Sequence, residues 1–224
     1  MKYRIIVSLL ALFLPWPLRR MALACLLGYA IHKTARIGYS VLCPGRLEMG
    51  PGARIGHLNL CREGVELLKL GEQAQIGNLN WITGAAVGST GHFAQQRERR
   101  PQLVVGDHAA VTNRHLIDCT NSITIGRFTT LAGFRSQLLT HSIDLYHSRQ
   151  SSAPICIGDY CFVGTDCVLL GGSTLPDKCV LGAKSLLNKQ YTETCWLYAG
   201  NPARAVKRLS GEVAYFTRSV GFVL

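Results

Sequence analysis

The sequence lacks an apolar run long enough to cross a bilayer as one helix, although it opens on two short ones. The first runs from Ile5 to Leu14, the breaker Pro15-Trp16-Pro17 follows, and a second begins after Arg19-Arg20. Neither reaches the roughly 20 residues that a spanning helix needs. No small-x-small cleavage site directly follows the first run, which argues against a cleaved signal peptide.

Residues 1–30 are therefore expected to form apolar helices. These helices either cap the hydrophobic end of the body or lie at a membrane surface as a hairpin. We expect membrane-surface contact, because Trp16 and four cations flank the apolar runs as interface anchors do. The cations are Lys2, Arg4, Arg19 and Arg20.

Acidic residues are scarce. The chain has 13 Asp and Glu against 24 Lys and Arg, for a net charge of +11. Such a balance favours acidic partners such as phosphates or anionic lipid, without identifying one.

The nine cysteines form no Cys-x-x-Cys pair and no His/Cys cluster with zinc spacing. An odd number of scattered cysteines is typical of small buried thiols in a reducing compartment. We therefore expect a cytoplasmic protein without a metal.

Aliphatic residues recur at every sixth position. Ile157, Val163, Leu169, Leu175 and Leu181 form the clearest series, and Leu70, Ile76 and Ile82 form another. A period of six fits short strands but not a straight helix. Strands of about four residues, each ending at a tight corner, build a solenoid whose three walls make a coil of about 18 residues. Ile157 should then stack on Leu175, and Val163 on Leu181, about 4.8 Å apart.

This period predicts a solenoid over residues 31–201. Two polar segments interrupt it and are expected to protrude as loops, at 89–102 and 138–154. Residues 202–224 lose the period and are expected to form a basic amphipathic helical extension that packs back on the solenoid.

The stretch "PICIGDYCFVGTDCVLLGGSTLPDKCVLGAKSLLNK", followed by "YAGNPARAVKRL", resembles the C-terminal half of the hexapeptide-repeat acyltransferases. It is most similar to those that O-acetylate sugars of cell-surface polysaccharides. The resemblance implies an all-β, left-handed parallel β-helix, a homotrimer, and acetyl-CoA as co-substrate. The acceptor would be a sugar, free or lipid-linked, at the cytoplasmic face of the inner membrane, and no nucleic acid is expected as a partner.

Transfer to a sugar hydroxyl needs a base, and histidine suits neutral pH. The resemblance places the catalytic histidine at His141, in the loop before the clean repeats. Asp144, three residues on, is expected to orient the imidazole as a carboxylate does in a catalytic triad. The rival is His115, which has a similar spacing to Asp118. His115 and Asn113 are also candidates for the substrate pocket.

The resemblance also implies residues for acetyl-CoA binding. These are Thr165, Ala183, Asn188, Lys189, Arg204 and Lys207. Exposed coil backbone at Thr165 and Ala183 would line the pantetheine arm, and the cations would meet the CoA phosphates.

Two other functions stay open at this point. A zinc-dependent carbonic-anhydrase-like enzyme shares the prism but needs three histidines, and no third histidine matches His141 and His147. A non-catalytic β-helix scaffold is consistent with the repeat and independent of His141.

Overall fold

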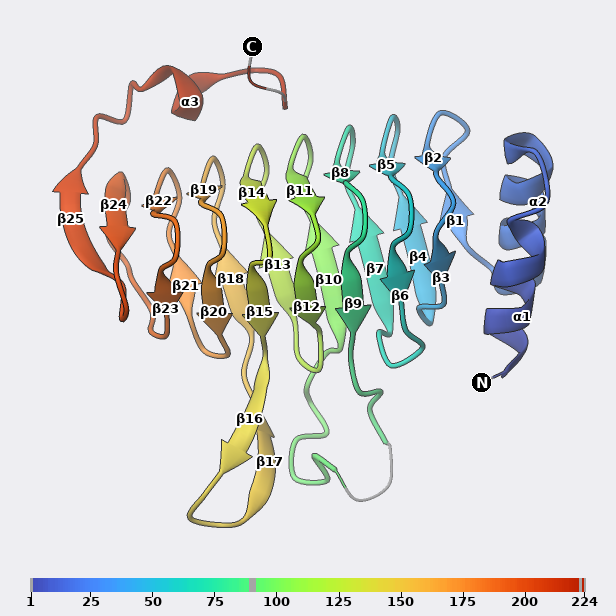
Figure 1. Ribbon diagram of the computed structural model, residues 1–224, viewed down its shortest axis with the longest axis horizontal. Coiled ribbons are helices and arrows are strands. Elements are labelled where there is room, and N and C mark those ends of the chain that lie inside the picture. Colours follow the sequence, from blue (N-terminus) through green and yellow to red (C-terminus); the bar gives the residue numbers. More distant parts are fainter. Residues whose placement is uncertain (1, 89–91, 222, 224) are drawn as a thin grey trace.

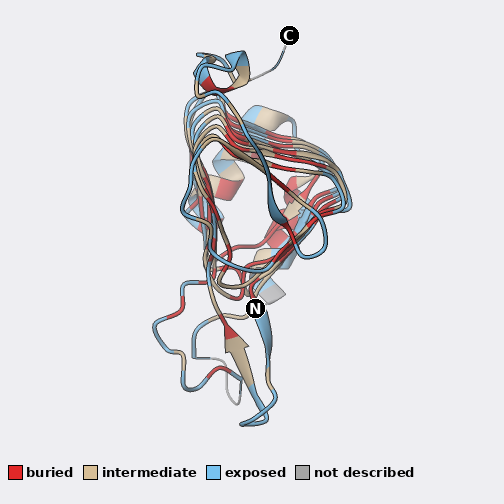
Figure 2. Ribbon diagram, turned by 90° about the vertical axis from the view of Figure 1, so that its left-hand side faces the viewer, coloured by how far each residue is buried: buried red, intermediate tan, exposed pale blue. Residues whose placement is uncertain are grey.

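The computed structural model describes residues 2–88, 92–221 and 223. Its body is a parallel β-helix with a triangular cross-section, seen down the coil axis in Figure 2. Each coil contributes one short strand to each of three walls. Ser89, Thr90 and Gly91, which belong to the first predicted loop, lie outside the described residues.

The three walls are parallel sheets, except where the last strand of the second wall turns back (Figure 1). The first wall contains β1 (Ala30–Ile31), β4 (Arg46–Met49), β7 (Leu67–Leu70), β10 (Gln102–Val105), β13 (Ile123–Ile125), β18 (Ile155–Ile157) and β21 (Thr174–Leu175). The second contains β2 (Arg36–Ile37), β5 (Arg54–Ile55), β8 (Gln75–Ile76), β11 (Ala110–Asn113), β14 (Thr130–Phe134), β19 (Phe162–Val163), β22 (Val180–Leu181), β24 (Trp196–Ala199) and β25 (Arg204–Arg208). The third contains β3 (Val41–Leu42), β6 (Leu60–Cys61), β9 (Trp81–Thr83), β12 (Leu116–Asp118), β15 (Gln137–Leu139), β20 (Val168–Leu170) and β23 (Leu186–Leu187).

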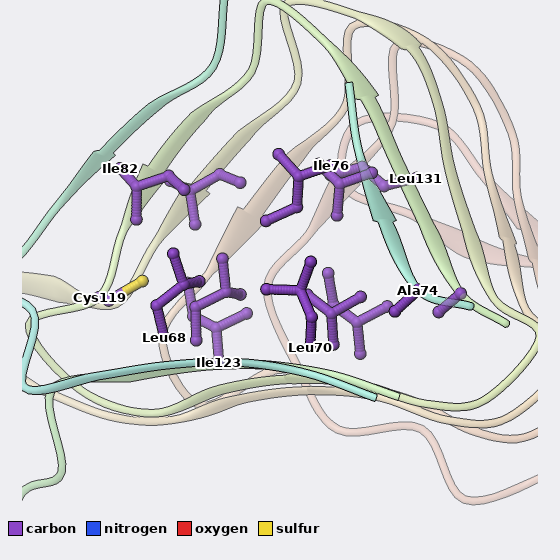
Figure 3. Packing of buried hydrophobic residues seen from close by; sticks show 14 of the residues in the cluster. Leu68, Leu70, Ala74, Ile76, Ile82, Cys119, Ile123 and Leu131 are labelled. Carbon is purple, nitrogen blue, oxygen red and sulfur yellow. The ribbon is translucent and has the colours of Figure 1, made fainter. Parts of the chain in front are cut away.

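The six-residue period is the inward-facing ladder of these walls. Ile157 pairs in register with Leu175, and Val163 with Leu181, so the predicted stacking is confirmed. Figure 3 shows the resulting core, in which Leu70, Ile76 and Ile82 come from the three walls of one coil. Burying each such aliphatic side chain contributes about 1.5–3 kcal/mol, and together these side chains hold the prism at fixed dimensions.

Both interruptions leave the prism at one edge, where the third wall turns into the first; we name this edge the third corner. Residues 84–101 connect β9 to β10 there. Two coils further along, the hairpin β16 (His141–Asp144) and β17 (Arg149–Ser152) connects β15 to β18. Figure 1 shows the two insertions projecting on the same side of the molecule.

Two helices, α1 (Lys2–Ala11) and α2 (Trp16–Leu27), lie against the N-terminal end of the prism (Figure 1). Among the described residues, no helix combines the length and hydropathy needed to span a membrane. Of the expected anchors, Arg19 and Trp16 face the protein rather than solvent. Arg19 is 4% exposed and donates to the carbonyls of Gly38 and Ser40 at 2.8 and 3.0 Å, while Trp16 packs on the core.

Arg4 and Arg20 likewise donate to coil carbonyls, those of Pro44 at 3.0 Å and Ile31 at 3.4 Å. The end of a β-helix leaves such carbonyls without a next coil, and these guanidinium groups satisfy them. Arg4, Arg19 and Arg20 therefore serve as capping residues. The buried Arg19 is not placed as a membrane anchor, and the membrane contact of this segment stays a prediction.

The C-terminal segment differs in part from expectation. A helix is present, but α3 covers only Ala214–Thr217. The basic stretch before it is β25, which pairs antiparallel with β24 and adds an edge to the second wall. Tyr215 donates to the Cys161 carbonyl at 3.1 Å, so the tail does fold back on the prism.

Candidate active site

His141 lies at the third corner, where β15 passes into the hairpin. Its Nδ1 is 2.7 Å from Oδ2 of Asp118, and its side chain is 46% exposed. Asp118 ends β12, one coil below, and is 7% exposed. Strand pairing places Asp118 beside Leu139, so the parallel register brings the carboxylate under His141.

The Asp118 carboxylate is held by hydrogen bonds on both oxygens. Oδ1 accepts from the Thr120 hydroxyl at 2.8 Å, and Oδ2 accepts from the backbone N–H groups of Thr140 at 3.2 Å and His141 at 3.3 Å. An ionised carboxylate only accepts, so His141 Nδ1 donates to it, and in the neutral form of the ring Nε2 carries the lone pair. Nε2 has no hydrogen-bond partner among the described residues. The arrangement is that of a positioned general base.

Asp144 does not orient His141, and that expectation is corrected. Asp144 instead contacts His147 Nδ1 at 2.8 Å and Arg149 Nε at 3.3 Å, at the exposed end of the hairpin. The hydrogen bond from His147 lowers the pKa of Asp144 below its usual value. Both His141 and Asp144 lie in β16, where residues three apart face opposite sides of the strand.

His115 lies inside the coil, as its spacing indicated, and is 1% exposed. Its Nδ1 accepts from the Ser136 backbone N–H at 3.2 Å, and its Nε2 lies 3.0 Å from the Thr112 hydroxyl. Burial lowers its pKa to about 4, which keeps the ring neutral. Within this chain the ring has no free nitrogen and no access to a substrate, so the expectation of a catalytic or substrate-binding His115 is wrong.

An open groove surrounds His141. It is lined by Arg62, Thr83, Gly84, Ala85, His92, Phe93, Asp118, Thr120, His141 and Gln150. These residues come from successive coils at the third corner and from both insertions. The groove is thus assembled across the coils and does not belong to one loop.

The segment 92–101 forms one side of this groove. Phe93 is 7% exposed and meets the His141 ring edge-on, with centroids 6.4 Å apart. Arg99 stacks over Phe93 at 4.7 Å and donates to the carbonyls of Thr120 at 2.9 Å and Ala86 at 2.6 Å. The sequence predicted this segment only as a polar protruding loop; the cation–π contact and the burial of Arg99 are visible only in the structure.

The hairpin and the segment 92–101 are joined to each other. Gln96 donates to the Ser152 carbonyl at 2.9 Å and accepts from the Ser152 backbone N–H at 2.8 Å. Because both insertions are held together, the groove around His141 has a defined wall.

The residues expected to bind acetyl-CoA lie elsewhere on the prism. Thr165 and Ala183 stack one coil apart at the corner between the second and third walls, where the Lys184 N–H donates to the Thr165 carbonyl at 2.9 Å. Ala183 is exposed, and the Thr165 hydroxyl donates to the Phe134 carbonyl at 3.0 Å. The structure brings these two residues together, at a different corner from His141.

The remaining candidates are exposed. Asn188 and Lys189 follow β23, at the C-terminal end of the third corner, whereas Arg204 and Lys207 lie on β25. Asn113 Oδ1 accepts from the Asn78 N–H at 2.7 Å, an exposed contact between coils at the corner of Thr165. Among the described residues, no three His, Cys, Asp or Glu side chains are grouped to hold a metal ion.

Comparisons with known proteins agree with this architecture. No protein-family model matches the chain. The structure of the polysialic acid O-acetyltransferase OatWY aligns over 85% of this chain and 90% of its own, with a TM-score of 0.63 at 17% identity. The hexapeptide-repeat acetyltransferase VCA0836 of Vibrio cholerae, solved with acetyl-CoA, aligns over 63% and 71%, with a TM-score of 0.52 at 24% identity. The chain therefore has the left-handed parallel β-helix fold.

Sequence similarity points the same way. The protein assigned to colanic acid biosynthesis as acetyltransferase WcaF in Escherichia coli K12 is 32% identical over 108 residues. The same identity is found with its counterpart in Shigella flexneri. The match covers 47% of this hexapeptide-repeat chain and 58% of either relative.

Proposed function

We propose that the protein transfers an acetyl group from acetyl-CoA to a hydroxyl of a sugar, in a cell-surface polysaccharide or its lipid-linked precursor. The main support for this proposal is the exposed His141, whose Nδ1 lies 2.7 Å from the buried Asp118 carboxylate. The similarity to a colanic acid biosynthesis acetyltransferase and the fold shared with an acetyl-CoA complex support the substrate classes.

The reaction uses His141 twice. Nε2 takes the proton of the sugar hydroxyl as the oxygen attacks the thioester carbonyl carbon, and Asp118 stabilises the imidazolium that forms. When the tetrahedral intermediate collapses, the carbon–sulfur bond breaks and the CoA thiolate takes the proton from His141. The products are the sugar ester and free CoA, with His141 neutral again.

A homotrimer would bring together the two parts of the active site that lie apart in one chain. Thr165 and Ala183 occupy a different corner from His141, so one prism does not place both beside one acetyl-CoA. In a three-fold assembly that corner of one subunit faces the His141 corner of its neighbour, and the pantetheine arm lies between them. Asn188, Lys189, Arg204 and Lys207 are the proposed contacts for the CoA phosphates, because they are exposed and three of them are cationic.

The protein is further proposed to act at the cytoplasmic membrane face, through apolar residues of α1 and α2. Several large side chains there point away from the prism. They include Ile6 (53% exposed), Leu10 (65%), Leu18 (52%) and Met21 (55%), together with Phe13 (88%) in the turn between the two helices. An apolar surface of this kind fits an interfacial location.

The test measures transfer of labelled acetyl from acetyl-CoA to an isolated polysaccharide precursor. His141→Ala should abolish transfer, and His147→Ala, the matched exposed histidine of the same hairpin, should leave it unchanged. Full activity in His141→Ala would refute the assignment and leave a scaffold as the alternative. Stoichiometric zinc in the purified protein, with loss of activity on chelation, would support the hydratase instead.

Deleting residues 1–30 tests the membrane part separately. The deletion should reduce partitioning onto vesicles of anionic lipid. Unchanged partitioning would refute the membrane contact without bearing on the chemistry.

A further inference from the structure

A second hollow runs along the third corner toward the N-terminal helices. It has a volume of about 450 Å³ and is lined by Ile5 of α1, Val41 and Leu60 of the third wall, and the Arg62–Gly64 corner, among others. It shares Arg62 and Gly84 with the groove around His141. The hollow and the groove therefore lie next to each other along this corner, with Arg62 and Gly84 bordering both.

The chemistry of this path changes in a fixed order. Ile5 is 42% exposed and belongs to the apolar surface of α1. Val41 and Leu60 (39% exposed) follow in register on adjacent coils of the third wall, and Trp81 (52%) pairs with Leu60 on the coil beyond. Arg62 follows Leu60 by two residues on the same coil, and its guanidinium has no ion pair or hydrogen bond among the described residues.

The spacing leaves room for a sugar beyond Arg62. Arg62, Thr83, Asp118 and Leu139 occupy successive coils at this corner, so Arg62 lies three strand spacings, roughly 14 Å, from the coil of His141. Glu63 also lines the hollow, and its Oε1 is buried without a hydrogen-bond partner among the described residues. An unpaired buried carboxylate oxygen is costly, and a sugar hydroxyl would satisfy it.

We propose that this path binds the carrier of a lipid-linked saccharide: the hydrocarbon chain against Val41 and Leu60, the phosphate at Arg62, and the saccharide between Arg62 and His141. The inference rests on the proposed function and narrows its acceptor to the lipid-linked class. We choose this ligand because the path is first apolar, then cationic at Arg62, and ends at the base His141. A lipid-linked saccharide has its hydrocarbon, phosphate and sugar in the same order.

The experiment uses the full chain and farnesyl phosphate, with farnesol and inorganic phosphate as separated parts. Binding is followed by calorimetry and by the fluorescence of Trp81, assigned through its loss in Trp81→Phe. Farnesyl phosphate should bind saturably and inorganic phosphate should not. Arg62→Ala should weaken farnesyl phosphate roughly tenfold while leaving farnesol unchanged. Leu60→Asp should weaken both.

Matched controls come from the same coil. Arg54→Ala removes an exposed arginine of the second wall, and Leu58→Asp changes a leucine that is 67% exposed at another corner. Both should bind as the wild type does. Equal effects of Arg62→Ala and Arg54→Ala, or no saturable binding, would overturn the proposal. Dissociation of an oligomer by Leu60→Asp in sedimentation would also overturn it, because the hollow would then be an interface between copies.

The two proposals fail separately. His141→Ala should bind farnesyl phosphate normally while losing acetyl transfer. Transfer to a soluble saccharide without farnesyl phosphate binding would refute only the lipid path. Binding without acetyl transfer to any saccharide would refute only the transferase.

Discussion

Replacing Asp118 with asparagine tests which carboxylate orients His141. Sequence spacing predicts Asp144, whereas the structure places Asp118 against the ring. The substitution keeps the shape of the side chain and removes its charge. Oδ2 receives two backbone N–H groups, from Thr140 and His141, whereas Oδ1 receives one, from Thr120. The amide oxygen of the asparagine should therefore occupy the Oδ2 position, and His141 Nδ1 should still donate to it.

The magnitude follows from this orientation. The tautomer of His141 is retained in this variant. The lost transition-state stabilisation is therefore the difference between a charge-assisted and a neutral hydrogen bond to the imidazolium, about 1–2 kcal/mol. Asp118→Asn should then lower kcat roughly 5- to 30-fold with little change in the KM for acetyl-CoA. His141→Ala, which removes the base, should lower it by roughly 10²- to 10⁴-fold.

The assay follows CoA thiol release from acetyl-CoA in the presence of acceptor, with the acetylated saccharide confirmed by mass spectrometry. Asp144→Asn is the matched control, because Asp144 contacts His147 and Arg149 instead. Its kcat should stay within about twofold of wild type. A large loss in Asp144→Asn with normal activity in Asp118→Asn would refute the reasoning. Thermal unfolding of both variants checks that the fold is intact.

Three further predictions concern the scaffold. The pKa of His115 is about 4 in the folded state and near 6.5 when unfolded, so protonation favours unfolding. The free energy of unfolding should fall by up to about 3 kcal/mol as the pH drops from 6.5 to 4. Urea unfolding should show a smaller loss in His115→Gln, and an equal loss would contradict this. Leu138→Ala, at a fully buried position directly before the hairpin, should cost about 2–5 kcal/mol and lower the melting temperature, whereas a change below 1 kcal/mol would contradict the packing. Arg99→Ala should raise hydrogen exchange in segment 92–101 and reduce acetyl transfer, with Arg97→Ala as the exposed control; unchanged exchange would show that Arg99 does not hold the segment.

The prism was predictable because its period is local. Each aliphatic residue at the sixth position lies on a strand of one wall. The pairs Ile157–Leu175 and Val163–Leu181 therefore follow from counting along the chain. The C-terminal strand was harder to predict from the sequence. Arg204–Arg208 has no repeat and a basic composition, and its state as β25 depends on the exposed edge of β24.

The partner of His141 was not predictable in the same way. The 17-residue interruption at 138–154 hides the register, so sequence proximity favoured Asp144 over a residue one coil below. The signal that could have identified Asp118 is the ladder itself: Leu138 continues the position of Ile117, which places Asp118 beside Leu139. Sequence spacing pairs Asp118 instead with His115, three residues before it, whose ring is buried inside the coil.

The geometry of the site therefore depends on the core more than on its own loops. Asp118 and the strand that leads into His141 belong to neighbouring coils, and the backbone hydrogen bonds of the third wall set their separation at one strand spacing. A hairpin inserted at the next coil would carry its histidine away from Asp118 by a further spacing, about 4.8 Å, and the 2.7 Å contact would be lost. The position of the interruption, one coil above an inward-held aspartate, is thus what turns an exposed loop histidine into a candidate base.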